Sequence, residues 1–379
     1  MRLPASDHLA ARHTRVRASL EALSLDALIV TAPTNIRYLT NHVGSAGTVV
    51  VTADTIHLLV DFRYRASVQA LQASASACPT LRVWTVPDSY DEALLACLTE
   101  MAVSTVGFEA SHLSVARHDW LLRSAASRDA GIALRPTDRV VEQLRVIKDA
   151  GEIALLREAA RRLTRVAAAG ITAARPGVTE RAVAAAIEGA LRDAGYERPA
   201  FDTIVGSGPN GALPHYRAGD RILEGGDVVV LDFGGVLDGY CCDLTRTVAV
   251  GAPTAQAHRV HGAVREAQLA AIAATRPGVA ATAVDAAARD VLEHHGLGEA
   301  FGHGTGHGLG LDVHEEPRIT RPLPDVPGVL LEPGMVFTIE PGAYLPGWGG
   351  VRIEDDVLVT DNGCEVLTDV PPDLIPKWI

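Results

Sequence analysis

The sequence has few cysteines, no excess of basic residues and no long apolar run. The five cysteines, at positions 78, 97, 241, 242 and 364, form an odd number without metal-knuckle spacing, which favours reduced thiols over a disulfide framework. No stretch reaches membrane-spanning length, and the N-terminal segment lacks the apolar run followed by small residues that a signal peptide needs. We therefore expect a soluble, cytoplasmic protein with no membrane partner.

Negative charge is concentrated in the second part of the chain. The formal net charge is -12, and residues 1–138 carry 12 Lys and Arg against 13 Asp and Glu, which leaves 22 against 33 for residues 139–379. Backbone binding to nucleic acid needs a basic face, so this balance argues against nucleic acid as a partner. Bound divalent metal would neutralise part of the excess.

A chain of 379 residues favours two domains. In residues 1–138, strand-like segments such as ALIV and TVVVT alternate with helical ones such as DEALLACLTEMA, which predicts a small sheet covered by helices. From residue 139 long helical patterns begin, so the predicted class is α/β (α+β) with domains at 1–138 and 139–379. The tetrapeptide RPGV, at 175–178 and 276–279, hints at a duplicated helix-helix-strand unit.

A histidine-rich segment, FGHGTGHGLGLDVHEE at 301–316, indicates a metal site. It contains His303, His307 and His314 among five glycines. Imidazole with carboxylate suits a divalent transition metal, whereas carboxylates alone would suggest calcium or magnesium. His303 and His307 are four residues apart, but the glycines exclude the helix of a zinc-protease motif, and the glutamate that follows its first histidine is missing.

Two acidic residues lie on a predicted hairpin, DVVVLDFGGVLDGYCCDLTRTVAV. Asp238-Gly239 is a two-residue turn signal, and paired positions across such a turn sum to an odd number. Asp232 and Asp243 have opposite parity, so their side chains are predicted to share one face and one ion.

A second acidic pair occurs in MVFTIEPGAYLPGWGGVRIEDDVLV. Glu340 is predicted to end one strand and Glu354 to sit in the next, across a Gly- and Pro-rich loop. Arg352 would share their face because side chains alternate along a strand. Four clustered carboxylates would repel each other without a cation. Two metal ions about 3.5 to 4 Å apart would remove that penalty, and they imply hydrolysis.

Each of these residues could also have an ordinary structural role. Taken singly, Asp232, Asp243 or Glu340 is more often an ordinary turn or strand-end residue. The segment GSGPNG at 206–211 matches a phosphate-binding pattern, but no helix start follows Pro209, so we predict a plain loop.

The motifs LDFG, CDLTRT, HGTGHGLGLDVHE, TIEPG and GGVRIED resemble the dinuclear metallopeptidases of the pita-bread fold (peptidase family M24), over residues 140–379. This family includes aminopeptidase P, prolidase and methionine aminopeptidase. The resemblance implies a creatinase-like N-terminal domain followed by a pita-bread catalytic domain. It assigns five metal ligands, with Asp243 and Glu354 bridging two ions: Asp232, Asp243, His307, Glu340 and Glu354.

The resemblance also implies roles for residues around the metals. Glu340 would act as general base toward a hydroxide that bridges the two ions. His215 and His314 would contact the substrate and stabilise the transition state. His303 would line the leaving-group pocket, and Arg352 would support the acidic cluster. Oxygen-rich ligation favours manganese, with cobalt or zinc as alternatives.

The expected function is that of an Xaa-Pro aminopeptidase acting on proline-containing peptides, and relatives of this kind suggest a homodimer. The main alternative is an Xaa-Pro dipeptidase (prolidase), and a minor one is a metal-free creatinase-like hydrolase or a non-catalytic binding module. The N-terminal segments GSAG and DFRY favour the aminopeptidase. Arg318 favours the dipeptidase, because relatives use an arginine at this position to contact the free carboxylate of the substrate.

Overall fold

The computed structural model describes residues 3–322, 324 and 328–375. The chain divides into two compact units, and the division falls between Arg145 and Val146. The sequence places the domain boundary at 138/139, just before helix α6 (Val140–Val146), whereas the packing division falls at the end of that helix.

The N-terminal unit is built on a six-stranded mixed sheet with the order β4-β3-β2-β1-β5-β6. Strands β1, β2 and β3 are buried along almost their whole length, as expected for strands that are covered on both faces. Leu94, Leu98 and Leu121, from α4 and α5, pack against Ile29 and Val50 of the sheet. The strands are β1 (Ala27–Val30), β2 (Thr48–Thr52), β3 (Ile56–Asp61), β4 (Leu81–Val86), β5 (Thr105–Glu109) and β6 (Ala133–Thr137). The helices are α1 (Ser6–Ala22), α2 (Pro33–Thr40), α3 (Arg65–Gln72), α4 (Tyr90–Glu100) and α5 (Val115–Ser127).

The second unit begins with a helix pair and a long hairpin. Asp149 caps the first helix in a reciprocal capping box with Glu152, and the Thr179 hydroxyl caps the second. Leu163, Val183 and Leu231 are among the residues of the shared core between helices and strands. The elements of this half are α7 (Ala150–Ala173), α8 (Glu180–Asp193), β7 (Arg198–Pro199), β8 (Ile204–Ser207), the 3₁₀ helix η1 (Gly208–Ala212), β9 (Val228–Leu237) and β10 (Tyr240–Ala249).

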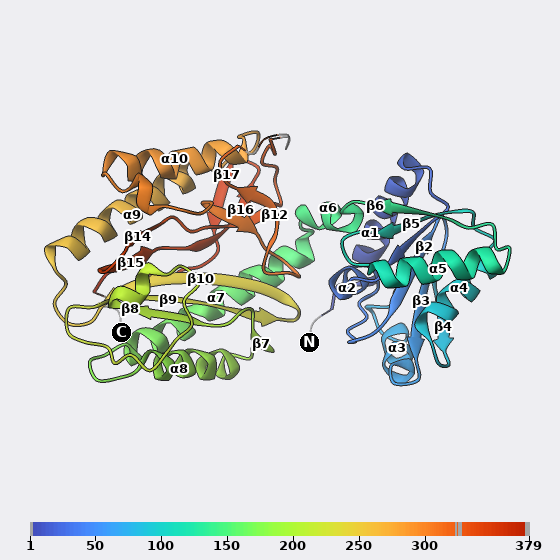
Figure 1. The fold of residues 1–379 in the computed structure, drawn as a ribbon, viewed down its shortest axis with the longest axis horizontal. Coiled ribbons are helices and arrows are strands. Elements are labelled where there is room, and N and C mark those ends of the chain that lie inside the picture. The colour runs from blue at the N-terminus through green and yellow to red at the C-terminus, as the bar shows by residue number, and fades with distance from the viewer. Residues whose placement is uncertain (1–2, 323, 325–327, 376–379) are drawn as a thin grey trace. The chain divides into compact units, whose positions relative to one another are not determined.

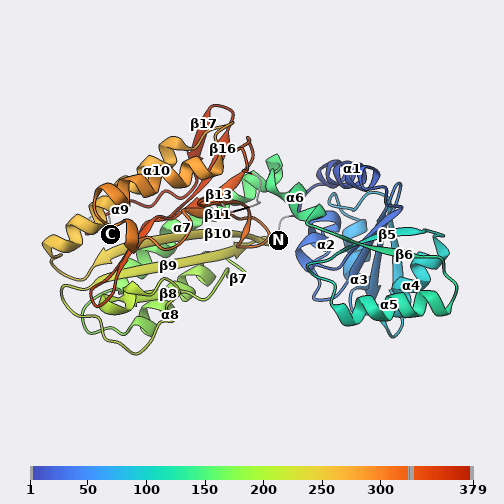
Figure 2. The ribbon, with the colours of Figure 1, turned by 45° about the horizontal axis from the view of Figure 1, so that its top comes forward.

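The following half repeats this order of a helix pair and strands. Val264 and Val284 of the helices pack against Phe337 and Val357 of a five-stranded sheet with the order β12-β11-β13-β16-β17. Figures 1 and 2 show α7 and α8 on one side of the strands of this unit and α9 and α10 on the other. The elements are α9 (Ala255–Ala274), α10 (Ala281–His294), the 3₁₀ helix η2 (Gly298–Ala300), β11 (Gly306–Gly308), β12 (Glu315–Ile319), β13 (Val336–Ile339), β14 (Gly342–Leu345), β15 (Gly349–Arg352), β16 (Asp355–Thr360) and β17 (Gly363–Val366).

Backbone hydrogen bonds support the duplication that the RPGV repeat suggested. In the first copy the Gly177 amide donates to the Leu223 carbonyl at 3.0 Å, and in the second the Gly278 amide donates to the Leu331 carbonyl at 2.8 Å. Both leucines begin similar segments, LEGGDVVVLDFG and LEPGMVFTIEPG, which run into β9 and β13. The predicted duplicated unit is therefore present in the structure.

Candidate metal centre

One cavity of about 670 Å³ lies in the second unit and brings all the predicted site residues together. Strands and loops of both halves contribute to its wall. The sequence-predicted residues that line it are His215, Asp232, Asp243, His303, His307, His314, Arg318, Glu340, Arg352 and Glu354.

The first two carboxylates come from the β9–β10 hairpin. The turn consists of Asp238 and Gly239, both with positive φ, the backbone form that fits the twist of a two-residue hairpin. Asp243 pairs with Gly234, two residues from Asp232, so both side chains emerge on the same face. The parity argument from the sequence is confirmed.

The second pair reaches the cavity by a different route from the predicted one. Glu340 follows β13, as expected, but Glu354 does not sit in the next strand: the β14–β15 hairpin intervenes, and Glu354 lies between β15 and β16. The β13–β16 register pairs Ile339 with Asp355, which sets Glu340 opposite Glu354. The prediction of two consecutive strands is wrong, because the Gly- and Pro-rich segment forms strands of its own.

Two hydrogen bonds join the second pair to the hairpin. The Thr245 hydroxyl donates to the Glu354 carboxylate at 2.6 Å, and the Glu354 amide donates to the Thr245 carbonyl at 3.1 Å. Asp243 is fixed at its backbone, where its amide donates to Asp356 at 3.0 Å. Thr245 and Asp356 were not singled out from the sequence, since a threonine and a second aspartate in a strand carry no distinguishing pattern.

A donor set suited to one ion is present without rearrangement. Asp243, His307 and Glu354 each offer one ligand atom, and these atoms lie within 4.8 Å of one another. The His307 Nδ1 atom is 3.1 Å from the Gly308 carbonyl, which can only accept, so Nδ1 carries the proton. Nε2 then keeps a free lone pair, as a metal ligand requires. This atom lies 3.6 Å from Oε1 of Glu340.

The electrostatics of this cluster also call for a cation. Oδ1 of Asp232 and Oδ1 of Asp243 are buried and have no hydrogen-bond partner among the described residues. Burial, followed by the charge of Asp232, raises the pKa of Asp243 well above its usual range, and burial raises the pKa of Glu340 to about 7. Buried carboxylates with unsatisfied oxygens are costly alone and are stabilised by metal. The residues present therefore fit a carboxylate and histidine metal site.

Arg352 supplies one internal positive charge to the cluster. Its buried guanidinium donates to Asp232, to the Tyr344 hydroxyl at 2.7 Å and to the Thr245 hydroxyl at 3.1 Å. This single cation faces four carboxylates, so it offsets only part of their repulsion. Tyr344, from β14, was missed in the sequence because GAYL shows no feature beyond a short strand.

The three remaining histidines differ in how their rings are held. His303 uses both nitrogens: Nδ1 lies 2.8 Å from the Gly304 carbonyl, and Nε2 lies 2.9 Å from the Tyr344 hydroxyl. Burial lowers the pKa of His303 to about 4, which keeps it neutral. His314 packs edge-on against His307, and burial lowers its pKa as well. His215 is exposed on the loop between β8 and β9.

The two units match two known family models. Residues 12–147 match the Creatinase/Prolidase N-terminal domain, and residues 154–361 match Metallopeptidase family M24. Every predicted site residue lies inside the second match. A cavity lined with carboxylates and histidines from two similar halves, in a unit that follows such a domain along the chain, defines a pita-bread peptidase. The chain belongs to metallopeptidase family M24, and the predicted family and fold class are confirmed.

Relatives that span nearly the whole chain have been named for peptidase activity. An uncharacterized peptidase of Bacillus subtilis strain 168, YqhT, is 38% identical over 363 residues, which cover 95% of this chain and 98% of the relative. The Xaa-Pro dipeptidase structure from Bacillus anthracis has a TM-score of 0.89 at 35% identity and covers 97% and 99% of the two chains. The X-Pro aminopeptidase structure from Thermotoga maritima MSB8 has a TM-score of 0.83 at 34% identity and covers 94% and 99%. The reaction class is therefore peptide hydrolysis. Throughout the described part of the chain, no helix is both long and apolar enough to span a bilayer.

Proposed function

We propose that this protein is a metal-dependent Xaa-Pro exopeptidase that prefers dipeptides. The observation that supports this function is the convergence of four carboxylates and an imidazole on one cavity that three further histidines also line. The names of the relatives from Bacillus anthracis and Thermotoga maritima support proline as the residue after the cleaved bond.

Five residues of this chain are proposed to hold two divalent ions: Asp232, Asp243, His307, Glu340 and Glu354. When bound there, the ions would activate a water molecule and polarise the carbonyl of the substrate. Because four of the five ligands are oxygen donors, we propose manganese as the preferred metal.

Glu340 is the residue proposed to accept the proton of the attacking water. Its side chain is 18% exposed, more than the 9% of neighbouring His307, so it borders the space that a substrate would fill. A general base must lie within hydrogen-bond reach of the proton it removes, and a position on the cavity wall satisfies this requirement.

The hydrogen bonds of the ring nitrogens distinguish the proposed roles of the other cavity histidines. Both nitrogens of His303 are engaged, so this ring would shape the pocket without donating a proton. Among the described residues no hydrogen bond engages the rings of His215 or His314, so their N–H groups are available to the substrate. We propose that these two donate to the oxygen that becomes negative in the transition state.

The preference for dipeptides is supported by Arg318. Its exposed side chain lines the cavity, and no carboxylate among the described residues pairs with its guanidinium. Arg217 also lines the cavity but is already 3.2 Å from Asp202. Arg318 is therefore the cation best placed to bind the free carboxylate of a short substrate. We propose this preference in place of the aminopeptidase expected from GSAG and DFRY, which lie in the N-terminal unit.

The test compares kcat/KM for an Xaa-Pro dipeptide with that for the same pair extended by several residues. We expect the dipeptide to be preferred by more than about tenfold, or about 1.4 kcal/mol of transition-state discrimination. Arg318→Ala should erase this preference, whereas the matched control Arg217→Ala should retain it. Equal or better cleavage of the longer peptide would establish the aminopeptidase, the second candidate, which the similarity to the Thermotoga maritima enzyme favours.

Metal dependence is tested separately. Exhaustive treatment with EDTA should abolish hydrolysis, and added manganese should restore it. Unchanged activity after removal of the metal would reject the proposed mechanism.

A further inference from the structure

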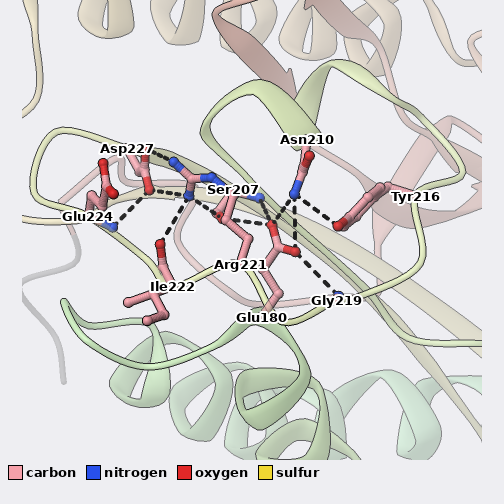
Figure 3. A network of polar contacts seen from close by, with 9 residues as sticks. All are labelled: Glu180, Ser207, Asn210, Tyr216, Gly219, Arg221, Ile222, Glu224 and Asp227. Atoms are coloured by element: carbon pink, nitrogen blue, oxygen red, sulfur yellow. Dashed lines mark hydrogen bonds and ion pairs between the residues drawn. The ribbon is translucent and has the colours of Figure 1, made fainter.

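The loop that carries His215 is fastened by one buried carboxylate outside the cavity. Glu180, the first residue of α8, is 0% exposed. Its Oε1 accepts hydrogen bonds from the Ser207 amide at 2.8 Å, the Ser207 hydroxyl at 2.7 Å and the Asn210 side-chain amide at 3.0 Å. Figure 3 shows these donors converging on the Glu180 carboxylate from the start of the loop.

The same carboxylate also holds the far end of the loop. Oε2 accepts from the Gly219 amide at 3.3 Å and from Asn210 at 3.2 Å. Backbone bonds reinforce this contact, because the Glu180 amide donates to the Arg221 carbonyl at 3.0 Å and the Arg181 amide donates to the Gly219 carbonyl at 2.9 Å. Residues 207–219 therefore form an arc whose two ends meet at Glu180, with His215 inside the arc.

Two further contacts connect this clamp to the rest of the site. Arg221 donates to the Ser207 hydroxyl at 2.7 Å and to Asp227 at 2.6 Å, immediately before β9, the strand of Asp232. At the start of the arc, a Cβ on Gly350 of β15 would overlap the Gly211 carbonyl, so the loop and that strand are in backbone contact. The Glu180 contacts, which form the clamp, thus fix the position of the loop relative to the strands that carry Asp232 and Arg352.

Only a carboxylate can accept this set of donors. Each oxygen of Glu180 takes bonds from two or three N–H or O–H groups, whereas an amide of equal size has one accepting oxygen and one donating nitrogen. In a Glu180→Gln variant the amide nitrogen would face the N–H groups of Gly219 or Asn210. The bonds at one end of the arc would be lost while the volume of the side chain stays the same.

We propose that Glu180 is a positioning residue for His215, one that fixes the loop so that the otherwise unheld imidazole meets the substrate. This inference rests on the proposed function. It requires Glu180 to act through His215 and not through the metal ligands, which lie on other strands and loops. A displacement of a reacting group by about 1 Å can reduce the rate by about a hundredfold.

The test is a double-mutant cycle with Glu180→Gln and His215→Ala in the metal-loaded, full-length protein. We expect Glu180→Gln to lower kcat between about 10-fold and 100-fold with KM changed by less than about twofold, and to leave the bound metal unchanged. In the His215→Ala background the same substitution should cause no further loss. An equal loss in both backgrounds, or a loss of metal, would overturn the proposal.

A second readout does not depend on activity. Hydrogen exchange of the amides in residues 208–219 should be faster in Glu180→Gln than in the wild type, while exchange in β9 and β10 stays unchanged. Glu224→Gln is the matched control, because this exposed glutamate adjoins the same network only through its backbone amide. Unchanged exchange in residues 208–219 would overturn the clamp even if no Xaa-Pro peptide is cleaved, so failure of the clamp and failure of the proposed function are distinguishable.

Asn210→Ala provides an independent variant should Glu180→Gln not fold. Asn210 is partly exposed, and its side chain contacts both oxygens of Glu180 and the Tyr216 hydroxyl, at 2.9 Å. We expect a smaller loss of kcat, about threefold to tenfold, that again disappears in the His215→Ala background. A loss that persists without His215 would overturn the proposal.

Discussion

In residues 146–250 and again in residues 255–366, a helix pair precedes strands that present two carboxylates to the cavity. The segments that begin at Leu223 and Leu331 place Asp232 and Glu340 nine residues later in each copy. A buried acid on the second helix then ties down a loop in each half: Glu180 accepts from the amide and hydroxyl of Ser207, and Asp285 accepts from the amide and hydroxyl of Thr305.

The two halves differ in the charged groups around the loop-binding acid and in the histidines that they contribute. Glu180 is held directly by neutral donors, whereas Asp285 forms a buried ion pair with Arg289, at 2.6 and 3.0 Å. Of the four histidines that line the cavity, the second half supplies His303, His307 and His314, and the first half supplies His215. The repeated backbone thus accounts for the symmetric carboxylates, and the second half supplies three of the four cavity histidines.

The largest effect should come from removing a carboxylate that the resemblance assigns to both ions. Asp243→Asn should lower bound metal and reduce kcat/KM by more than about 100-fold, because loss of a ligand exceeds the effect of losing a residue behind it. Glu354→Gln, its counterpart in the other half, should behave alike. The measurements are metal analysis and peptide hydrolysis. Full metal content in either variant would break the equivalence of the two halves.

His314→Ala sharpens the same comparison, since His314 packs against the ligand His307, and the proposed ligands of the first half include no histidine. Because His314 is proposed to act on the transition state, the variant should keep its metal and lose mainly kcat, by about 10²-fold. An empty metal site in this variant would contradict the division between ligands and substrate-binding histidines.

The two loop-tying acids should differ in their contribution to folding. Asp285→Asn leaves the buried Arg289 without its partner and should cost about 3–5 kcal/mol. Glu180→Gln breaks hydrogen bonds to neutral donors and should cost about 1–3 kcal/mol. Denaturant unfolding of both variants gives the comparison. A larger cost for Glu180→Gln would show that the neutral clamp carries more of the stability than the ion pair.

Acid sensitivity should be concentrated in the second half, where His261 of α9 is buried. Burial, followed by the charge of Arg265, lowers the pKa of His261 to about 4. As the pH falls, the histidine of the unfolded chain is therefore protonated before the buried one. The contribution of neutral His261 to the free energy of unfolding is complete above about pH 6.5 and is lost as the pH falls toward 4, by up to about 3 kcal/mol. His261→Gln should flatten the fall in unfolding free energy over this range. The exposed His258, on the same helix, is the control, and an unchanged slope in His261→Gln would contradict the assignment.

The smallest effect is expected at the surface link between the halves. Arg157 of α7 and Glu365 of β17 are 2.6 Å apart, with side chains 50% and 39% exposed. Solvent screens such pairs, so Arg157→Ala should change the free energy of unfolding by about 0–1 kcal/mol. Urea unfolding in low and high salt provides the measurement. A cost near that of Asp285→Asn would mean that surface charge, and not the buried network, holds the halves together.

Local patterns in the sequence predicted the parts of the site that neighbouring residues determine. The β9–β10 register follows from the two-residue turn and from the alternation of side chains along each strand. The β14–β15 hairpin was missed because its few strand residues lie among glycines and a proline. Tyr344 acquires its role only from contacts with Arg352 and His303 across the fold.

The proposed substrate preference depends on contacts that sequence patterns do not give. GSAG and DFRY favoured an aminopeptidase, but they belong to the N-terminal unit, whereas Arg318 lines the cavity itself. Only the structure shows that Arg217 forms an ion pair with Asp202, whereas Arg318 has no carboxylate partner among the described residues. Manganese, the homodimer and the cytoplasmic location stay predictions.

The tight turn at Asp238 and Gly239 restricts how the distance along the chain between two ligands can vary. Adding one residue to the strand between the turn and Asp243 would turn that side chain to the opposite face of the ribbon, whereas adding one on each side of the turn would restore the alignment. Insertions compatible with function should therefore occur in matched pairs, or as local bulges that absorb the extra residue. A new loop grafted onto the tip of the hairpin would therefore have to add the same number of residues to both strands.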